Sequence, residues 1–229
     1  MHSIQYQNAA SLASERSEFI RKVYMNLALG FAGFIALEAF LVTWQPAVDL
    51  AQRMVSGNNW LIVLLAFMGV SWLANSWAAA GATLGKQYAG FALYIIAEAI
   101  IFLPLIIFAN SFAPDTIPQA GIITAALTAG ISAYAFFSKK DFSFMGSFLT
   151  IASFVALGII ACAVLFGIQL GLWFSAAMIV FAGLVILYQT SVMIRRYRND
   201  QYVVAALGLF AAIALMFWYI LQFLISSRR

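Results

Sequence analysis

The chain has 229 residues, of which 65% are hydrophobic and 9% are charged, and its mean hydropathy is +0.97. An ordinary soluble domain carries about a quarter charged residues, so this composition excludes that class. The net charge of +4 is explained by the orientation of a membrane protein, as shown below. We therefore expect no binding to nucleic acid.

Seven apolar runs are long enough to cross a membrane, because a hydrocarbon core ~30 Å thick needs about 20 residues of helix. The fold class predicted is an all-α membrane protein, a seven-transmembrane-helix bundle in the lipid bilayer. Residues 1–22 form an N-terminal tail, and residues 23–229 form the single transmembrane domain. The expected helices are 23–43, 60–79, 88–109, 119–138, 146–166, 171–192 and 202–225.

Lysines and arginines predict the orientation of the bundle, since they gather on the cytoplasmic side. The side that holds the N-terminus and the loops after the second, fourth and sixth helices carries nine of these residues, whereas the other side carries three. The N-terminus is therefore expected inside and the C-terminus outside, so that residues 1–22 form a cytoplasmic tail.

Two ionisable side chains fall well inside the predicted spans, Glu38 in the first helix and Glu98 near the middle of the third. A charged carboxylate in hydrocarbon costs ~2.5 kcal/mol or more. Glu38 is then either a neutral or snorkelling carboxyl near the outer surface, and Glu98 a neutral carboxyl bonded to a neighbouring helix. Alternatively, both carboxyls line a path for protons or cations through the bundle.

The residues that most enzymes use are missing from the predicted membrane core. His2 is the only histidine of the chain, which excludes a serine–histidine pair and a histidine metal site within one chain. No aspartate lies inside any predicted span, and there is no P-loop or dinucleotide fingerprint. We expect a protein that is not an enzyme and that has no metal site and no cofactor.

Two polar segments interrupt the apolar pattern. The first is a short hinge between the fourth and fifth helices that contains Lys139, Lys140 and Asp141. The second, Tyr188-Gln189-Thr190-Ser191, closes the sixth helix. Its side chains either bond across to neighbouring helices, or form a gate or ion-coordinating site at the cytoplasmic mouth.

Four segments resemble the Bax inhibitor-1 family, and in particular its bacterial YccA-like branch. They are Phe19-Ile-Arg-Lys-Val-Tyr24, the stretch from Tyr94 to Pro104, Ser138-Lys-Lys-Asp-Phe-Ser-Phe-Met-Gly-Ser-Phe-Leu149 and Ile186-Leu-Tyr-Gln-Thr-Ser191. The resemblance covers most of the chain and implies six helices around a central seventh. It also implies a multi-pass protein of the inner (plasma) membrane. Family members are described as pH-sensitive calcium-leak channels, as suppressors of cell death, and in the YccA-like branch as modulators of the membrane protease FtsH.

The chain departs from this family at one functional feature. The family's leak is assigned to two aspartates, on the sixth and seventh helices, which share a proton as a coupled pair. The matching positions here are Gln189 and, at or near it, Ala212, so the pair is missing. The resemblance therefore favours a non-enzymatic modulator of a membrane protease such as FtsH, or of membrane-protein quality control. The alternative is a passive calcium, cation or proton leak that uses Glu98 and Glu38 and lacks the pH response of the aspartate pair.

Overall fold

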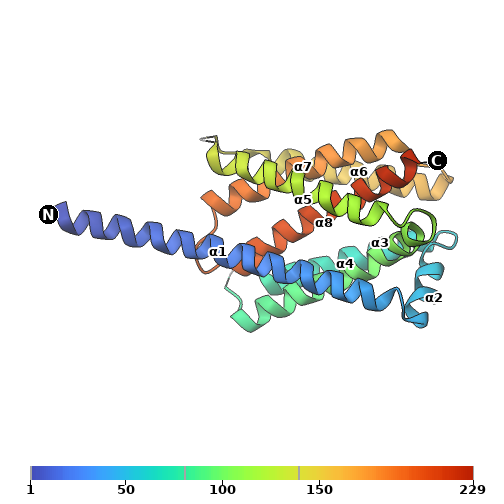
Figure 1. Cartoon of the computed structure of the whole chain (residues 1–229), viewed down its shortest axis with the longest axis horizontal. Coiled ribbons are helices and arrows are strands. Elements are labelled where there is room, and N and C mark those ends of the chain that lie inside the picture. Colours follow the sequence, from blue (N-terminus) through green and yellow to red (C-terminus); the bar gives the residue numbers. More distant parts are fainter. Residues whose placement is uncertain (1, 80, 139, 229) are drawn as a thin grey trace.

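The computed structural model describes residues 2–79, 81–138 and 140–228, with side chains from residue 14 onward. Within these ranges seven helices are long and apolar enough to cross a membrane, which confirms the predicted fold class. They are α1 (His2–Leu41), α3 (Asn59–Ala78), α4 (Leu84–Phe112), α5 (Thr116–Phe137), α6 (Gly146–Phe166), α7 (Leu172–Arg195) and α8 (Tyr202–Ser227). Figure 1 shows them side by side in one bundle.

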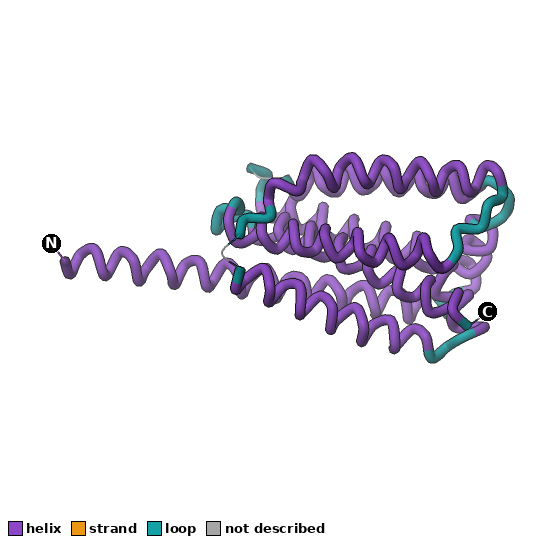
Figure 2. Tube along the Cα trace, turned by 90° about the horizontal axis from the view of Figure 1, so that it is seen from above, coloured by secondary structure: helices purple, strands orange, loops and turns teal. Residues whose placement is uncertain are grey.

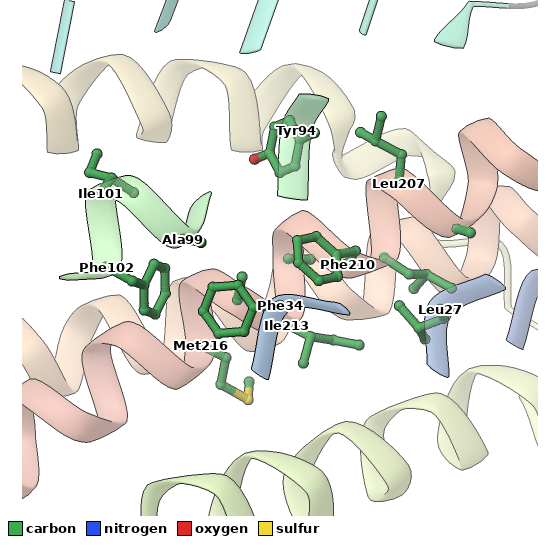
Figure 3. Close-up of a cluster of buried hydrophobic side chains, with 14 of the residues drawn as sticks. Leu27, Phe34, Tyr94, Ala99, Ile101, Phe102, Leu207, Phe210, Ile213 and Met216 are labelled. Atoms are coloured by element: carbon green, nitrogen blue, oxygen red, sulfur yellow. The ribbon is translucent and has the colours of Figure 1, made fainter. Parts of the chain in front are cut away.

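The last helix, α8, forms the centre of the bundle. In its most apolar stretch 67% of the residues are buried, against 44% or less in the other six spans. It packs against α1, α3, α4, α5 and α7. The ring of Phe210 lies within 6.2 Å, centre to centre, of four aromatic rings on α1 and α4, some of which Figure 3 shows. This is the arrangement that the resemblance implies, with a central seventh span.

Helices α3 and α6 lie at the periphery, since only 11% of the residues in the most apolar stretch of each are buried. Helix α3 packs closely on α4, because Gly90 leaves room for the backbone of Ala74 and Ala78. Helix α6 presents only Leu149, Ala156 and Ala163 to the interior. Most side chains of α6 face outward, where lipid would surround them.

A short helix that the sequence does not predict, α2 (Gln45–Met54), follows the first span. Pro46 stands in its first turn, where the missing N–H removes no helical bond. Ala47, Ala51 and Met54 share its buried face, and α2 packs mainly against α4. In Figure 1 it crosses the end of the bundle. Its amphipathic pattern is typical of a helix that lies at a membrane surface.

The first helix is longer than the sequence predicts. The sequence assigns residues 1–22 to a tail and begins the first span at residue 23, but α1 is continuous from His2 to Leu41. Phe19 is 1% exposed, so the helix joins the bundle core before residue 23. Its N-terminal part extends well beyond the other helices (Figures 1 and 2). The two ends of the chain lie at opposite ends of the bundle, as an odd number of crossings requires.

Candidate functional site: two buried carboxyls and a polar end of the bundle

Glu98 lies on the inner face of α4 and is 6% exposed. The side chain of Tyr94, one turn earlier on the same helix, forms a hydrogen bond with its carboxyl group. Tyr94 in turn packs edge-on against Phe210 of the central helix, as Figure 3 shows for the two labelled rings. Glu98 therefore has a partner on its own helix, whereas one of the two interpretations of the sequence expected a bond to a neighbouring helix.

Glu38 is equally buried, at 6% exposed, on the inner face of α1. Both of its carboxylate oxygens lack a hydrogen-bond partner among the described residues. A carboxyl that snorkels to the surface would be exposed at its tip, so the snorkelling interpretation is wrong. The side chain is enclosed one turn before the end of α1 at Leu41.

The two carboxyls do not form a pair. Helices α1 and α4 meet where the rings of Phe34 and Phe102 lie 5.3 Å apart. Gly30 lies beside Phe91 further back along both helices, so the helices run parallel. Neither carboxyl acts on the other, because both oxygens of Glu38 lack a hydrogen-bond partner among the described residues and the side chain bonded to Glu98 is Tyr94. Any path that used both carboxyls would need further polar groups between them.

Gln189 lies at the contact between α7 and the central helix. A side chain at Gly208 would place its Cβ only 2.9 Å from Oε1 of Gln189. The residue opposite Gln189 is therefore Gly208. Ala212, the position that the resemblance pairs with Gln189, lies one turn further along α8 in the apolar core. Gly208 is therefore the residue against which Gln189 packs. Where the family has a pair of aspartates, this chain has a close contact between α7 and α8.

The hinge after α5 is tied to the end of α7. The backbone N–H of Phe142 donates to the hydroxyl of Ser191 at 3.0 Å, and Arg196 lies 3.5 Å from the carboxylate of Asp141. The guanidinium of Arg195 donates to the carbonyl oxygens of Ser138 and Lys140. Lys139, the remaining predicted hinge residue, lies outside the described residues. The two polar segments of the sequence are therefore one structural unit.

Hydrogen bonds hold the carboxylate of Asp141 in its charged form. The side chain and backbone N–H of Ser143 bind it first, with the N–H at 2.9 Å, and Arg196 and the Ser191 hydroxyl add to them. These interactions lower the pKa of Asp141 below its ordinary value. Asp141 is thus an anchor for the start of α6 and the end of α7.

Arg16 of α1 contacts the end of α7, which the sequence did not predict. Its guanidinium donates to the carbonyl oxygens of Met193, Ile194 and Tyr197, at 2.5 to 2.9 Å. Carbonyls at the end of a helix have no partner within it, and a cation there also suits the helix dipole. Arg16 therefore attaches the extended first helix to the end of α7. Its position just before the first apolar run is the one signal in the sequence.

The described residues hold no cluster of three or more histidine, cysteine, aspartate or glutamate side chains that could bind a metal ion. The site thus consists of buried single carboxyls within the bundle, and of a hydrogen-bonded polar network at the end from which α1 extends.

Comparisons with known proteins place these features in a family. The model of the family described as "Inhibitor of apoptosis-promoting Bax1" matches residues 16–229. An uncharacterized protein of Pseudomonas aeruginosa is 29% identical, over 97% of this chain and 96% of its own length. The Golgi anti-apoptotic protein of vaccinia virus is 27% identical over 93% of this chain and 87% of its own. Mouse protein lifeguard 4 is 26% identical over 91% and 85%.

Proposed function

This chain belongs to the Bax inhibitor-1 family of multi-pass membrane proteins, and we propose that it is a non-enzymatic modulator of a membrane protease or of membrane-protein quality control. Its relatives include a viral protein named for an anti-apoptotic role, which is a regulatory rather than a catalytic description. We assign the chain to the YccA-like branch and to the inner (plasma) membrane, with FtsH as the protease.

The observation that carries this proposal is the extension of α1 beyond the bundle (Figures 1 and 2). Of the twelve lysines and arginines, ten lie in described residues, and eight of these belong to the end of the bundle from which α1 extends. The positive-inside rule then predicts that this end, with the N-terminus, lies in the cytoplasm. An exposed helix on the cytoplasmic side is accessible to the soluble part of a membrane protease.

Arg16 gives the extension a connection to the bundle. A partner that held the first turns of α1 would act through Arg16 on the end of α7, and through Asp141 on the hinge. The apolar spans would stay in the bilayer throughout. Regulation by contact therefore needs no ion path and no catalytic group.

A truncation tests this proposal. Deleting residues 2–13 removes the extension and leaves Arg16 and its three carbonyl contacts in place. We expect co-purification with FtsH from bacterial membranes to fall roughly tenfold, which corresponds to about 1.4 kcal/mol of lost contact. Turnover of an FtsH substrate should change in parallel. The variant Arg228→Ala, altered at the opposite end of the bundle, serves as the matched control. Unchanged co-purification and turnover in the truncated protein would refute the proposal.

A second function is favoured by the buried carboxyls. Glu38 and Glu98 are both 6% exposed, and Glu38 has no described hydrogen-bond partner. A passive leak for calcium, other cations or protons would use these groups, because intramembrane carboxyls commonly mark ion paths. Without the family's aspartate pair, such a leak would lack strong pH gating.

Flux measurements in liposomes decide this second function. Purified protein is compared with empty liposomes for calcium and proton flux at two pH values. If the leak exists, Glu98→Gln should abolish it, and Glu15→Gln, which changes an exposed carboxyl of α1, should not. Flux equal to that of empty liposomes would eliminate the leak, and normal flux in Glu98→Gln would remove that residue from the path.

A further inference from the structure

Three hydroxyl groups toward the periphery of the bundle form hydrogen bonds with the backbone of their own helix. Ser111 donates to the carbonyl oxygen of Ile107, Thr150 to that of Gly146, and Ser153 to that of Leu149, at 2.8 to 2.9 Å. This bond to the carbonyl four residues earlier is the usual solution for serine and threonine in a membrane helix. No other ligand is needed at these positions.

Five hydroxyl groups inside the bundle behave differently, that of Ser71 on α3 and four on α5 and α7. The hydroxyl oxygens of Thr124, Thr128, Ser175 and Thr190 are buried and have no hydrogen-bond partner within the described part of the chain. Thr124 is 4% exposed, and Ser175 and Thr190 are fully buried. Two of the four lie on α5 and two on α7. A buried hydroxyl without a partner is costly, and proteins commonly satisfy such groups with internal water.

Helices α5 and α7, which carry four of these groups, are in contact. Helix α5 packs against both α7 and α8. A Cβ at Gly183 of α7 would lie 3.3 Å from Ile131 of α5 and 3.6 Å from the terminal methyl of Met216 of α8. The three helices therefore meet at Gly183, one turn from Thr128. Figure 3 shows the Met216 side chain extending from α8.

The hydroxyls on α5 form a row. Thr124, Thr128 and Ser132 follow one another at intervals of four residues, which is about 6 Å per step along one helix face. The Ser132 side chain is hydrogen-bonded to Tyr24 of α1, so the row ends at a polar group on another helix. These three residues of α5 are called the hydroxyl seam.

We propose that the hydroxyl seam binds a file of water molecules inside the bundle. Each hydroxyl can donate one hydrogen bond and accept others, which is what a water file needs from its walls. The seam residues are uncharged, and Glu38 and Glu98 lie on other helices. The seam is therefore a hydration site distinct from the carboxyls, and it stands whether or not the protein modulates a protease.

X-ray radiolysis of the full-length protein in lipid nanodiscs tests this inference, because the hydroxyl radicals it makes from bound water oxidise the nearest side chains. Met216 is only 1% exposed, so bulk water cannot reach it. We expect Met216 to be oxidised in the wild type. The double change Thr124→Val and Thr128→Val keeps the side-chain shapes and removes the polar partners. It should lower oxidation of Met216 by roughly threefold, since a buried water molecule needs polar partners.

Two control variants keep the test decisive. Thr150→Val removes a self-satisfied hydroxyl on α6 and should leave Met216 oxidation unchanged. Thr124→Ser keeps the hydroxyl group and should leave oxidation of Met216 at the wild-type level. It therefore separates loss of the hydroxyl from the effect of any substitution at residue 124. A wild type in which Met216 is not oxidised, or equal oxidation in the folded valine double variant, would overturn the inference.

Discussion

Asp141 shows how one exposed residue can join two parts of the chain. Its carboxylate accepts a hydrogen bond from the backbone of Ser143 and lies 3.5 Å from Arg196 of the neighbouring helix. The motif that contains Asp141 is visible in the sequence, but its partners are not, because Arg196 is 55 residues away along the chain. Contacts at that separation depend on how the helices pack.

The stability that Asp141 provides should depend on pH. Its pKa is lowered in the folded protein, so its contribution is present above the ordinary carboxyl value of about 4 and is lost as the pH falls through the lower folded value. Asp141→Asn should therefore lower Tm slightly at pH 7. The difference from wild type should disappear in strongly acidic buffer.

Thermal unfolding in detergent, measured at several pH values, checks this expectation. Asp115→Asn, which changes an exposed aspartate at the other end of the bundle, is the control variant. A difference between Asp141→Asn and wild type that persists unchanged at the lowest pH would contradict the assigned role of the charge.

Among the elements, α3 and α4 show how a single glycine sets a helix contact. A Cβ at Gly90 would lie 2.5 Å from the carbonyl oxygen of Ala74 and 2.8 Å from the backbone nitrogen of Ala78. Membrane helices approach closely only where such small residues meet. Because the clash is with backbone, no side-chain rotation can relieve it.

Gly90→Ala should push α3 away from α4 and destabilise the protein by about 1 to 3 kcal/mol, the usual cost of overpacking. Gly130→Ala in α5 is the matched control, since nothing lies within 4 Å of its Cβ position. There the better helix propensity of alanine should leave stability equal or slightly higher. Chemical unfolding of both variants in the same micelles measures the difference, and equal stabilities would contradict the packing described.

Element boundaries differ in how well the sequence indicates them. The apolar runs indicate where helices lie because lipid requires a continuous apolar surface. Helix α2 is not indicated by an apolar run, since only Ala47, Ala51 and Met54 of its ten residues are buried. The early start of α1 also escapes it, because residues outside the membrane need not be apolar to be helical.

For the whole molecule, the central position of α8 decides where stability is concentrated. Phe210 is fully buried and contacts rings from α1 and α4. Phe154 of α6 is just as apolar but 68% exposed. In a bilayer both rings have an apolar environment, so what distinguishes them is close packing with protein rather than removal from water.

Phe210→Ala should therefore cost about 2 kcal/mol or more through the cavity it leaves, whereas Phe154→Ala should have little effect because lipid fills the space. Unfolding of the two variants in identical bicelles compares them directly. A loss of stability for Phe154→Ala as large as for Phe210→Ala would mean that α6 packs on protein in the membrane.

The sequence by itself determined the class of this protein and the number of its spans, because hydrophobic length is a local property that lipid tests segment by segment. It also indicated two carboxyls inside the spans, Glu38 and Glu98, and the polar hinge. Only the tertiary structure decided that the carboxyls stand apart, that Gln189 faces Gly208, and that Arg16 holds α1 to the end of α7. Which helix lies at the centre, and which hydroxyls face inward, depend on pairwise packing between helices. Because an apolar helix has no pronounced polar face, its sequence does not indicate which helices it packs against.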